Sequence, residues 1–268
     1  MKLDQGGVNM GDKNFDYILE MKNVGMRFGN VEALRNINFS VGKNEVVGLL
    51  GDNGAGKSTM VKIITGVLHP TCGELYIREQ RVTAKDYTVK KAHSFGIETV
   101  YQDKSLGEKQ ALWRNFFIGR QITNRLGFID IKKEKEIADN IIMEMIGFRG
   151  VGIGVDSKVN KLSGGERQGI AIGRAMHFDA DLIILDEPTV SLSVKEVRKV
   201  LQFVEKIRDS GRACVYISHN IGHVYDISDR FVIVDRGMVV ANFTKSEMTL
   251  EKLDAFLLKY ASKKRGEE

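Results

Sequence analysis

Short runs of apolar residues recur along this chain, and each ends in glycines or in polar side chains. Runs over residues 46–50, 96–101, 182–185 and 213–217 are typical of buried strands. Between them lie stretches with helical spacing, over residues 60–67, 88–95 and 167–177. The alternation of buried strands with helices predicts an α/β domain.

The N-terminal part of the chain has a different pattern. Residues 1–14 are rich in glycine and lack apolar periodicity, so we expect them to be loosely ordered. Short strands are then predicted over 18–21, 31–34 and 37–41, with turns between them. This pattern indicates an antiparallel β subdomain at the start of a single domain that covers 15–268.

Residues 103–160 change character again. They have the spacing of amphipathic helices, most clearly over 132–146, and contain the only tryptophan, Trp113. We interpret them as a helical subdomain inserted into the α/β domain.

Composition narrows the possible functions only slightly. The chain has 268 residues, of which 43% are hydrophobic, which is ample for a buried core. No apolar run approaches the roughly 18 residues needed to cross a bilayer, and we expect a soluble chain. Cys72 and Cys214 have no metal-ligand spacing and favour a reducing cytoplasm.

Charge gives little support to a nucleic-acid partner. The net charge of +5 comes from 40 basic and 35 acidic residues spread along the chain. We therefore predict no nucleic-acid binding. A basic cluster near the C-terminus is interpreted as a solvated tail, with contact to lipid head groups as the alternative. It consists of Lys259, Lys263, Lys264 and Arg265.

A glycine-rich loop connects the first buried strand to a helix. Its residues are Gly51, Asp52, Asn53, Gly54, Ala55, Gly56, Lys57, Ser58 and Thr59. Glycines allow successive backbone N–H groups to point at phosphate oxygens, and the helix N-terminus adds partial positive charge. We predict a phosphate-binding loop in which Lys57 reaches the β- and γ-phosphates and Ser58 binds Mg²⁺. The alternatives are a serine-capped turn and a dinucleotide fingerprint, whose glycine spacing this loop does not match.

Two carboxylates follow the buried strand at 182–185. Asp186 is placed to hold Mg²⁺, and Glu187 is placed to orient and polarise an attacking water. In the alternative interpretation, both residues only cap the strand and start a helix at Pro188.

The segment Leu162-Ser163-Gly164-Gly165-Glu166 precedes another helix. Ser163 and Glu166 have the spacing of a capping box, a structural device that needs no ligand. Adjacent glycines are not required for a cap, and we expect them to expose the helix N-terminus. The segment is therefore a candidate for a second anion-binding site.

Three further positions are candidates for nucleotide contacts. Gln102 and His219 each follow a buried strand, at the edge where open α/β sheets bind ligands, and His219 can hydrogen-bond a γ-phosphate. Phe28 lies in a predicted turn, where it can stack on an adenine. The alternatives are a structural histidine and a core aromatic residue.

Taken together, these motifs resemble the ATP-binding subunits of ABC transporters, over about residues 17–245. The segment 162–166 is the specific part, since many other ATPases share the loop and the acidic strand end. The resemblance implies a P-loop NTPase fold of the ABC type that binds ATP and Mg²⁺. It also implies that Glu187 is the catalytic base, that His219 is a switch residue and that Phe28 stacks on adenine.

The resemblance further implies shared sites and a membrane partner. Ser163 and Gly165 would grip the ATP held by the opposite subunit of an ATP-dependent homodimer. Gln102 would contact the metal and the γ-phosphate and relay nucleotide state to an integral-membrane permease. The subunit would then lie at the cytoplasmic face of the membrane as a peripheral protein.

Within the family, segments 96–102, 190–196 and 217–220 resemble the monosaccharide importers of bacteria. These imply a periplasmic or extracellular sugar-binding protein as a further partner. Two positions depart from the broad family pattern: Glu166 stands where glutamine is commoner, and Ser193 stands where most members have an aspartate that bridges the subunits. Many chains of that branch carry two tandem units, whereas this one has room for one.

Our main hypothesis is an ATPase that drives a separate permease for a simple sugar. The second is a soluble ABC-type ATPase acting on a cytoplasmic partner, as in iron–sulfur cluster assembly or nucleic-acid repair. The absence of a long coiled-coil insertion and of zinc-ligand cysteines weighs against repair. A third, a catalytically idle binding module, is opposed by the presence of Lys57, Asp186, Glu187 and His219.

Overall fold

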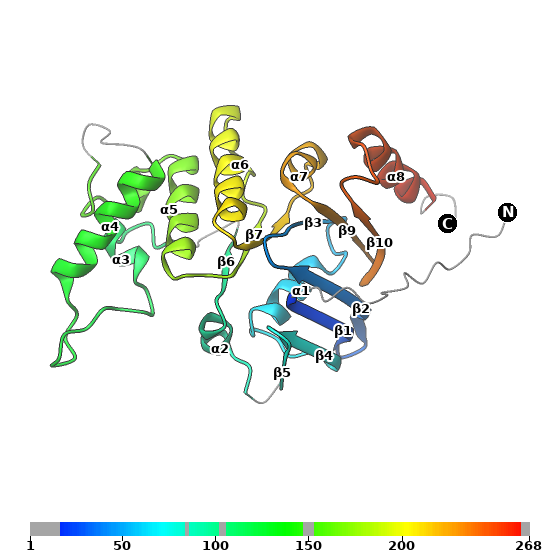
Figure 1. The fold of residues 1–268 in the computed structure, drawn as a ribbon, viewed down its shortest axis with the longest axis horizontal. Coiled ribbons are helices and arrows are strands. Elements are labelled where there is room, and N and C mark those ends of the chain that lie inside the picture. Colours follow the sequence, from blue (N-terminus) through cyan, green and yellow to red (C-terminus); the bar gives the residue numbers. More distant parts are fainter. Residues whose placement is uncertain (1–16, 84–85, 102–105, 147–152, 264–268) are drawn as a thin grey trace.

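A six-stranded sheet and a smaller antiparallel sheet organise the computed structural model, which describes residues 17–83, 86–101, 106–146 and 153–263 (Figure 1). The six-stranded sheet has the order β10-β9-β3-β8-β7-β6. Its strands are β3 (Val46–Leu50), β6 (Ile97–Val100), β7 (Leu182–Asp186), β8 (Ala213–Ile217), β9 (Arg230–Asp235) and β10 (Met238–Thr244). All neighbours are parallel except β9 and β10, which form an antiparallel edge.

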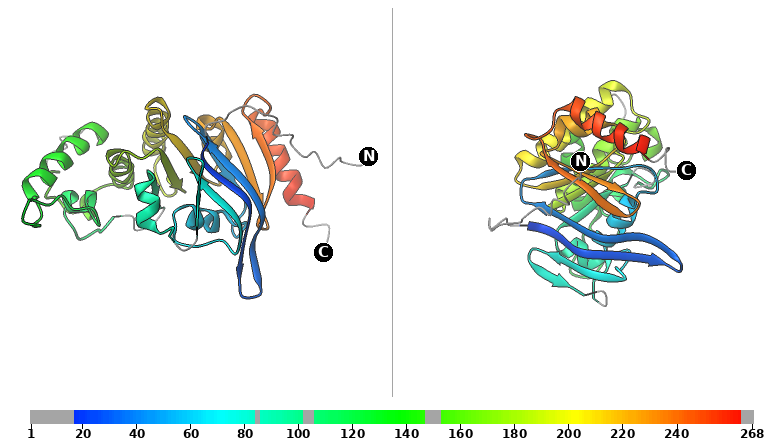
Figure 2. Two further views of the ribbon diagram at one scale, coloured as in Figure 1. Left: turned by 60° about the horizontal axis from the view of Figure 1, so that its bottom comes forward. Right: turned by 90° about the vertical axis from the view of Figure 1, so that its right-hand side faces the viewer.

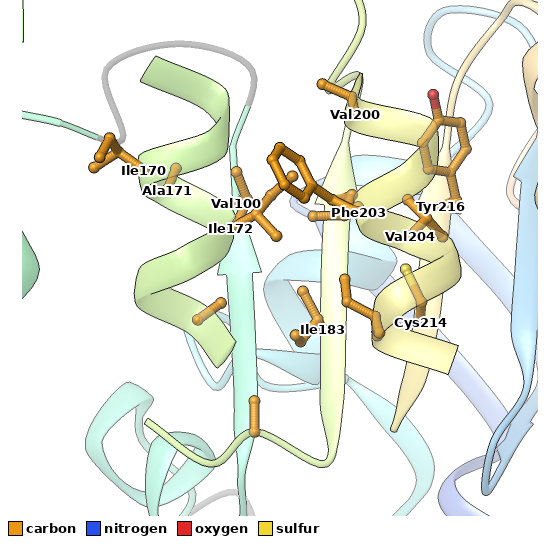
Figure 3. Packing of buried hydrophobic residues seen from close by; sticks show 14 of the residues in the cluster. Val100, Ile170, Ala171, Ile172, Ile183, Val200, Phe203, Val204, Cys214 and Tyr216 are labelled. Carbon is orange, nitrogen blue, oxygen red and sulfur yellow. The ribbon is translucent and has the colours of Figure 1, made fainter. Parts of the chain in front are cut away.

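The central strands are apolar on both faces because both faces are covered. On one face, Ile183 and Leu185 belong to a core shared with α5 (Gly164–His177) and α6 (Val194–Asp209). Figure 3 shows these two helices packing over β6, β7 and β8. On the other face, Leu182 and Ile184 pack toward α1 (Lys57–Ile64) and the antiparallel sheet. Such two-sided burial produces the continuous apolar runs seen in the sequence.

The antiparallel sheet contains longer strands than the sequence suggested. Its order is β2-β1-β4-β5, with β1 (Tyr17–Phe28), β2 (Val31–Gly42), β4 (Cys72–Ile77) and β5 (Gln80–Val82). The three predicted short strands are segments of β1 and β2, which form one long hairpin (Figure 2). Irregularities in the β1–β2 register interrupt the alternation of apolar and polar residues, and these interruptions were interpreted as turns between separate strands. Phe28 is the last residue of β1, so its placement within a turn was wrong.

A helical arm projects beyond α5, on the side away from the sheet (Figures 1 and 2). It contains α3 (Leu112–Phe116), α4 (Ile131–Ile146) and the 3₁₀ turn η1 (Val159–Lys161). The amphipathic helix predicted over 132–146 is confirmed as α4. Arg120 of the arm forms an ion pair with Glu98, a buried carboxylate of β6. The arm is thereby attached to the sheet.

The remaining helices are α2 (Val89–Ser94), α7 (Ile221–Ile227) and α8 (Leu250–Lys263). Neither the helices α7 and α8 nor the edge strands β9 and β10 were predicted from the sequence. No helix begins at Pro188, because α6 starts at Val194. The alternative in which Asp186 and Glu187 merely begin a helix is therefore wrong. The predicted loose N-terminus at 1–14 lies outside the described residues.

Candidate functional site

The glycine-rich loop connects β3 to α1, as predicted. Gly51 adopts φ +151° and Gly56 adopts φ +113°, conformations that side chains rarely tolerate. A Cβ at Gly51 would lie 2.2 Å from the carbonyl oxygen of Val234 in β9. Gly56 is the N-cap of α1, so the loop leads directly into the positive end of a helix dipole.

Lys57 is the first residue of α1, and its side chain folds back over the loop. Its Nζ donates to the carbonyl oxygens of Gly51 at 2.6 Å and Asp52 at 3.0 Å. Burial lowers the pKa of Lys57, while the nearby carboxylates, Glu187 first among them, oppose that shift. The ammonium group is therefore held between the loop and the acidic end of β7.

Glu187 follows β7 in a strained backbone conformation, with φ +51°. Its N–H donates to the carbonyl oxygen of Ile217 at the end of β8, at 2.9 Å. One carboxylate oxygen, Oε1, lies 2.9 Å from Nδ1 of His219. The other, Oε2, is buried without a hydrogen-bond partner in the structure. A buried acceptor of this kind requires a donor, and a water between Glu187 and a bound nucleotide would supply one.

The loop and the strand ends line one pocket. Asp186, Glu187 and loop residues 52–59 form one part of its wall. The other part comes from residues that the sequence analysis missed, namely Val31, Glu32, Ala33, Arg236 and Gly237. Gly237 donates its N–H to the Ala55 carbonyl oxygen at 2.8 Å, so the β9–β10 turn supports the phosphate loop. The signal for this turn was the Asp235-Arg236-Gly237 sequence, which is typical of a hairpin.

A second hollow joins the same loop to His219. It is lined by Gly51, Asp52, Asn53, Glu187, Val190 and His219. Phe28 lines neither pocket and is 46% exposed at the tip of the β1–β2 hairpin. Its predicted adenine contact stays a prediction, as does the role of Gln102, which lies outside the described residues.

Two of the three residues predicted to hold Mg²⁺ can share one metal site, and the third, Gln102, lies outside the described residues. Ser58 and Asp186 line the same pocket. Burial, followed by the nearby Glu187, raises the pKa of Asp186, while Lys57 opposes the shift. Among the described residues, no cluster of three or more histidine, cysteine or acidic side chains could hold a metal alone. Such a sparse donor set suits Mg²⁺, which is usually bound by one or two protein groups together with substrate phosphates.

The capping box at the start of α5 is present in full. Ser163 Oγ accepts from the Glu166 N–H at 3.2 Å, and Glu166 Oε2 accepts from the Ser163 N–H at 2.8 Å. The glycines have a different role from the one expected. A Cβ at Gly165 would lie 2.6 Å from Cγ of Glu196, so this glycine admits a side chain of α6. The prediction that both glycines expose the α5 terminus is therefore wrong for Gly165, which is buried with its N–H in use, whereas Ser163 is exposed and Gly164 is half-buried.

Glu196 was not identified as a functional candidate from the sequence. Its Oε1 accepts from the Gly165 N–H at 2.9 Å, and its Oε2 accepts from the N–H and Oγ of Ser193. The Ser193-x-x-Glu196 spacing indicates a carboxylate at the start of α6. It does not reveal the contact with α5, which depends on how the two helices pack.

A model of the ABC transporter family matches residues 34–190, more than half of the chain and including the phosphate loop, the 162–166 segment and the acidic strand end. The chain belongs to the ABC transporter family. The fold and the family predicted from the motifs are confirmed.

Curated relatives of this ABC subunit are named as sugar import proteins. The xylose/arabinose import ATP-binding protein XylG of Sulfolobus acidocaldarius is 38% identical, over 91% of this chain and 95% of the relative. The arabinose import ATP-binding protein AraG of Chromohalobacter salexigens is 36% identical over 90% of this chain. The ribose import ATP-binding protein RbsA of Caldanaerobacter subterraneus subsp. tengcongensis is 32% identical over 88%. The chain spans only 46% of each of the last two relatives.

Solved structures have the same fold as this ABC subunit. A nucleotide-free ATP-binding cassette from an ABC transporter gives a TM-score of 0.74 at 25% identity, over 86% of this chain and 93% of the other. A dimeric post-hydrolysis cassette bound to ADP and Pi gives 0.71 at 26% identity, over 85% and 98%. Within the described part of the subunit, no helix is both long and apolar enough to span a membrane.

Proposed function

We propose that this chain hydrolyses ATP as a head-to-tail homodimer and thereby drives a separate membrane permease that imports a simple sugar. One observation carries the hydrolytic part: the pocket brings the phosphate loop against Glu187, one of whose oxygens is buried without a partner. A general base must reach the proton that it removes, and Glu187 lines the same pocket as the phosphate loop.

Each residue of the pocket has a distinct proposed role. Loop N–H groups and Lys57 bind the phosphates, and Glu187 Oε2 orients the attacking water and removes its proton. His219 contacts Glu187 Oε1 through Nδ1, and the rest of its ring would hydrogen-bond the γ-phosphate. Ser58 and Asp186 would hold Mg²⁺, which supplies charge neutralisation at the phosphates.

The proposed dimer follows from two half-sites on one chain. The phosphate loop with Asp186 and Glu187 forms one half, and Ser163 with Gly165 at the start of α5 forms the other. We propose that residues 103–160 act as an inserted helical subdomain that carries the second half-site away from the first. Two-fold pairing then completes two identical sites between subunits. Because ATP would bridge the subunits, ATP binding and dimerisation favour each other.

Sugar import is supported by the names of the relatives, of which XylG matches over nearly the full length of both chains. On this proposal the subunit lies at the cytoplasmic face of the membrane and works with a permease and a periplasmic or extracellular sugar-binding protein. The alternative, a soluble ATPase on a cytoplasmic partner, receives no support from these relatives.

Sedimentation of Glu187→Gln tests the shared site. The variant retains the phosphate loop but lacks the base, so we expect it to be monomeric without nucleotide and dimeric with ATP. Ser163→Ala in the same background should weaken that dimer. If Glu187→Gln remained monomeric with ATP at every protein concentration, the two half-sites would not be shared.

Co-purification of the native complex tests the transport part. Detergent extracts of cells that express a tagged subunit should yield an integral-membrane permease, and the permease in lipid should stimulate the ATPase rate. Recovery of a soluble cytoplasmic partner instead, with no permease and no stimulation, would favour the alternative function.

A further inference from the structure

A carboxylate of the subunit itself occupies the start of α5. Glu196 reaches across from α6, which packs beside α5 (Figures 1 and 3), and accepts the Gly165 N–H at 2.9 Å. Its other oxygen accepts the N–H and Oγ of Ser193 at 3.0 and 2.8 Å. The Gly165 donor that the proposed function assigns to the partner's ATP is therefore already in use.

Packing around Gly165 places the Glu196 side chain against its backbone, although Ser163 beside it is exposed. A Cβ at Gly165 would lie 2.6 Å from the Glu196 Cγ, and one at Gly164 would lie 2.8 Å from Cδ2 of Leu192. The Glu196 side chain thus lies directly against the first turn of α5. A phosphate oxygen cannot reach the Gly165 N–H while Glu196 Oε1 is there.

The group is also an anion throughout the physiological range. Hydrogen bonds from Gly165, then from Ser193 and Ser163, lower the pKa of Glu196 to about 2. A negative charge suits a helix N-terminus, where the dipole and the free N–H groups favour it. It also repels a γ-phosphate that approaches the same turn.

We propose that Glu196 is a further residue of the shared ATP site, an internal anion that fills the α5 terminus in the separated subunit and is displaced by the partner's ATP. This inference rests on the proposed function, because it requires Gly165 to bind the opposite ATP. Displacement costs the contacts of Glu196 with Gly165 and Ser163 at the start of α5, while Oε2 can keep both hydrogen bonds from Ser193. The exchange would keep the dimer from closing at low ATP.

The test compares dimerisation in the hydrolysis-blocked background. Sedimentation equilibrium with saturating ATP gives the dimer dissociation constants of Glu187→Gln and of the double variant Glu187→Gln with Glu196→Gln. A neutral amide holds Gly165 more weakly than a carboxylate does, and two contacts are exchanged per dimer. We expect the double variant to dimerise about tenfold more tightly, since a charge-assisted hydrogen bond contributes roughly twice as much as a neutral one.

A matched control and a second variant keep the test decisive. Glu205→Gln removes the same charge from an exposed position of α6 and should leave the dissociation constant unchanged. Glu196→Asp keeps the charge beside Ser193 at the start of α6 but is one methylene too short for Gly165. Glu196→Asp should therefore also lower the dimer dissociation constant, and it replaces the glutamine variant in the test if that variant fails to fold.

The two possible failures are distinguishable. If Glu187→Gln alone does not dimerise with ATP, the proposed function fails. If it dimerises, but both Glu196 variants match the control or dimerise more weakly, only this inference is overturned. Weaker dimerisation would mean that Glu196 positions Ser193 and Gly165 for the partner rather than blocking them.

Discussion

Replacement of Glu187 by glutamine is the most direct test of the catalytic site. The amide has the shape of the carboxylate and can adopt the same backbone conformation at φ +51°, so the pocket should persist. What is lost is the buried oxygen Oε2 as a base. Removal of a general base commonly costs about 10² to 10⁴ in rate, and we expect kcat to fall by that factor.

The loss of rate in His219→Ala tests whether His219 does more than hold Glu187. If the ring only held Glu187 through the 2.9 Å contact at Oε1, its loss would cost one hydrogen bond, about 0.5 to 1.5 kcal/mol, or up to about tenfold in rate. The side chain of His219 is 70% exposed beside the pocket, so the rest of the ring is accessible to a γ-phosphate. We therefore expect a loss larger than tenfold.

The assay is steady-state ATP hydrolysis at saturating ATP, with equilibrium ATP binding and a thermal melt of each variant. Both variants should bind ATP as the parent does, because the phosphate loop is unchanged. Glu205→Gln, on the surface of α6, is the matched control. A Glu187→Gln variant that hydrolysed ATP near the parent rate would refute the assignment of the base.

Four further predictions follow from single positions. Lys57→Ala should weaken ATP binding itself, and unchanged equilibrium binding would contradict the loop assignment. Gly51→Ala should lower the urea-derived free energy of unfolding by about 3 kcal/mol, because its Cβ meets a β9 carbonyl at 2.2 Å; Gly29→Ala, with open space around it, should cost only about 1 kcal/mol. Gln102→Ala should spare ATP binding but remove stimulation of the ATPase by permease in lipid, and equal stimulation would exclude Gln102 from the relay. Because the pKa of Glu196 is lowered, its ionised carboxylate stabilises the fold fully above about pH 4.5, and this contribution is lost toward pH 2. The free energy of unfolding of Glu196→Gln should therefore depend less on pH in that window, as acid-unfolding curves would show.

The phosphate site could be predicted from the sequence because its signals are local. The glycine spacing before Lys57 favours a phosphate-binding loop, and the short apolar run before it is typical of a buried strand. The same logic placed Asp186 at the end of β7 and His219 just after β8, with strand bounds close to those observed. Family membership followed from these motifs together with residues 162–166.

The order of the strands, by contrast, was decided by tertiary packing. The order β3-β8-β7 brings residues from three distant segments to one edge, where Glu187 contacts both Ile217 and His219. Pairing between distant strands depends on the whole sheet, and no local pattern encodes it. The turn between β9 and β10 has a local signal, but the position of this hairpin beside β3, where Gly237 supports the phosphate loop, depends on the same pairing.

At the start of α5, one feature was predictable from the local sequence and another depended on tertiary packing. The spacing of Ser163 and Glu166 determined the capping box, because that device closes within one turn of a helix. Whether the terminus is open depends on α6, whose approach places Glu196 against Gly165. A side chain from 31 residues away fills the site, and only the packing of two helices on the sheet brings it there.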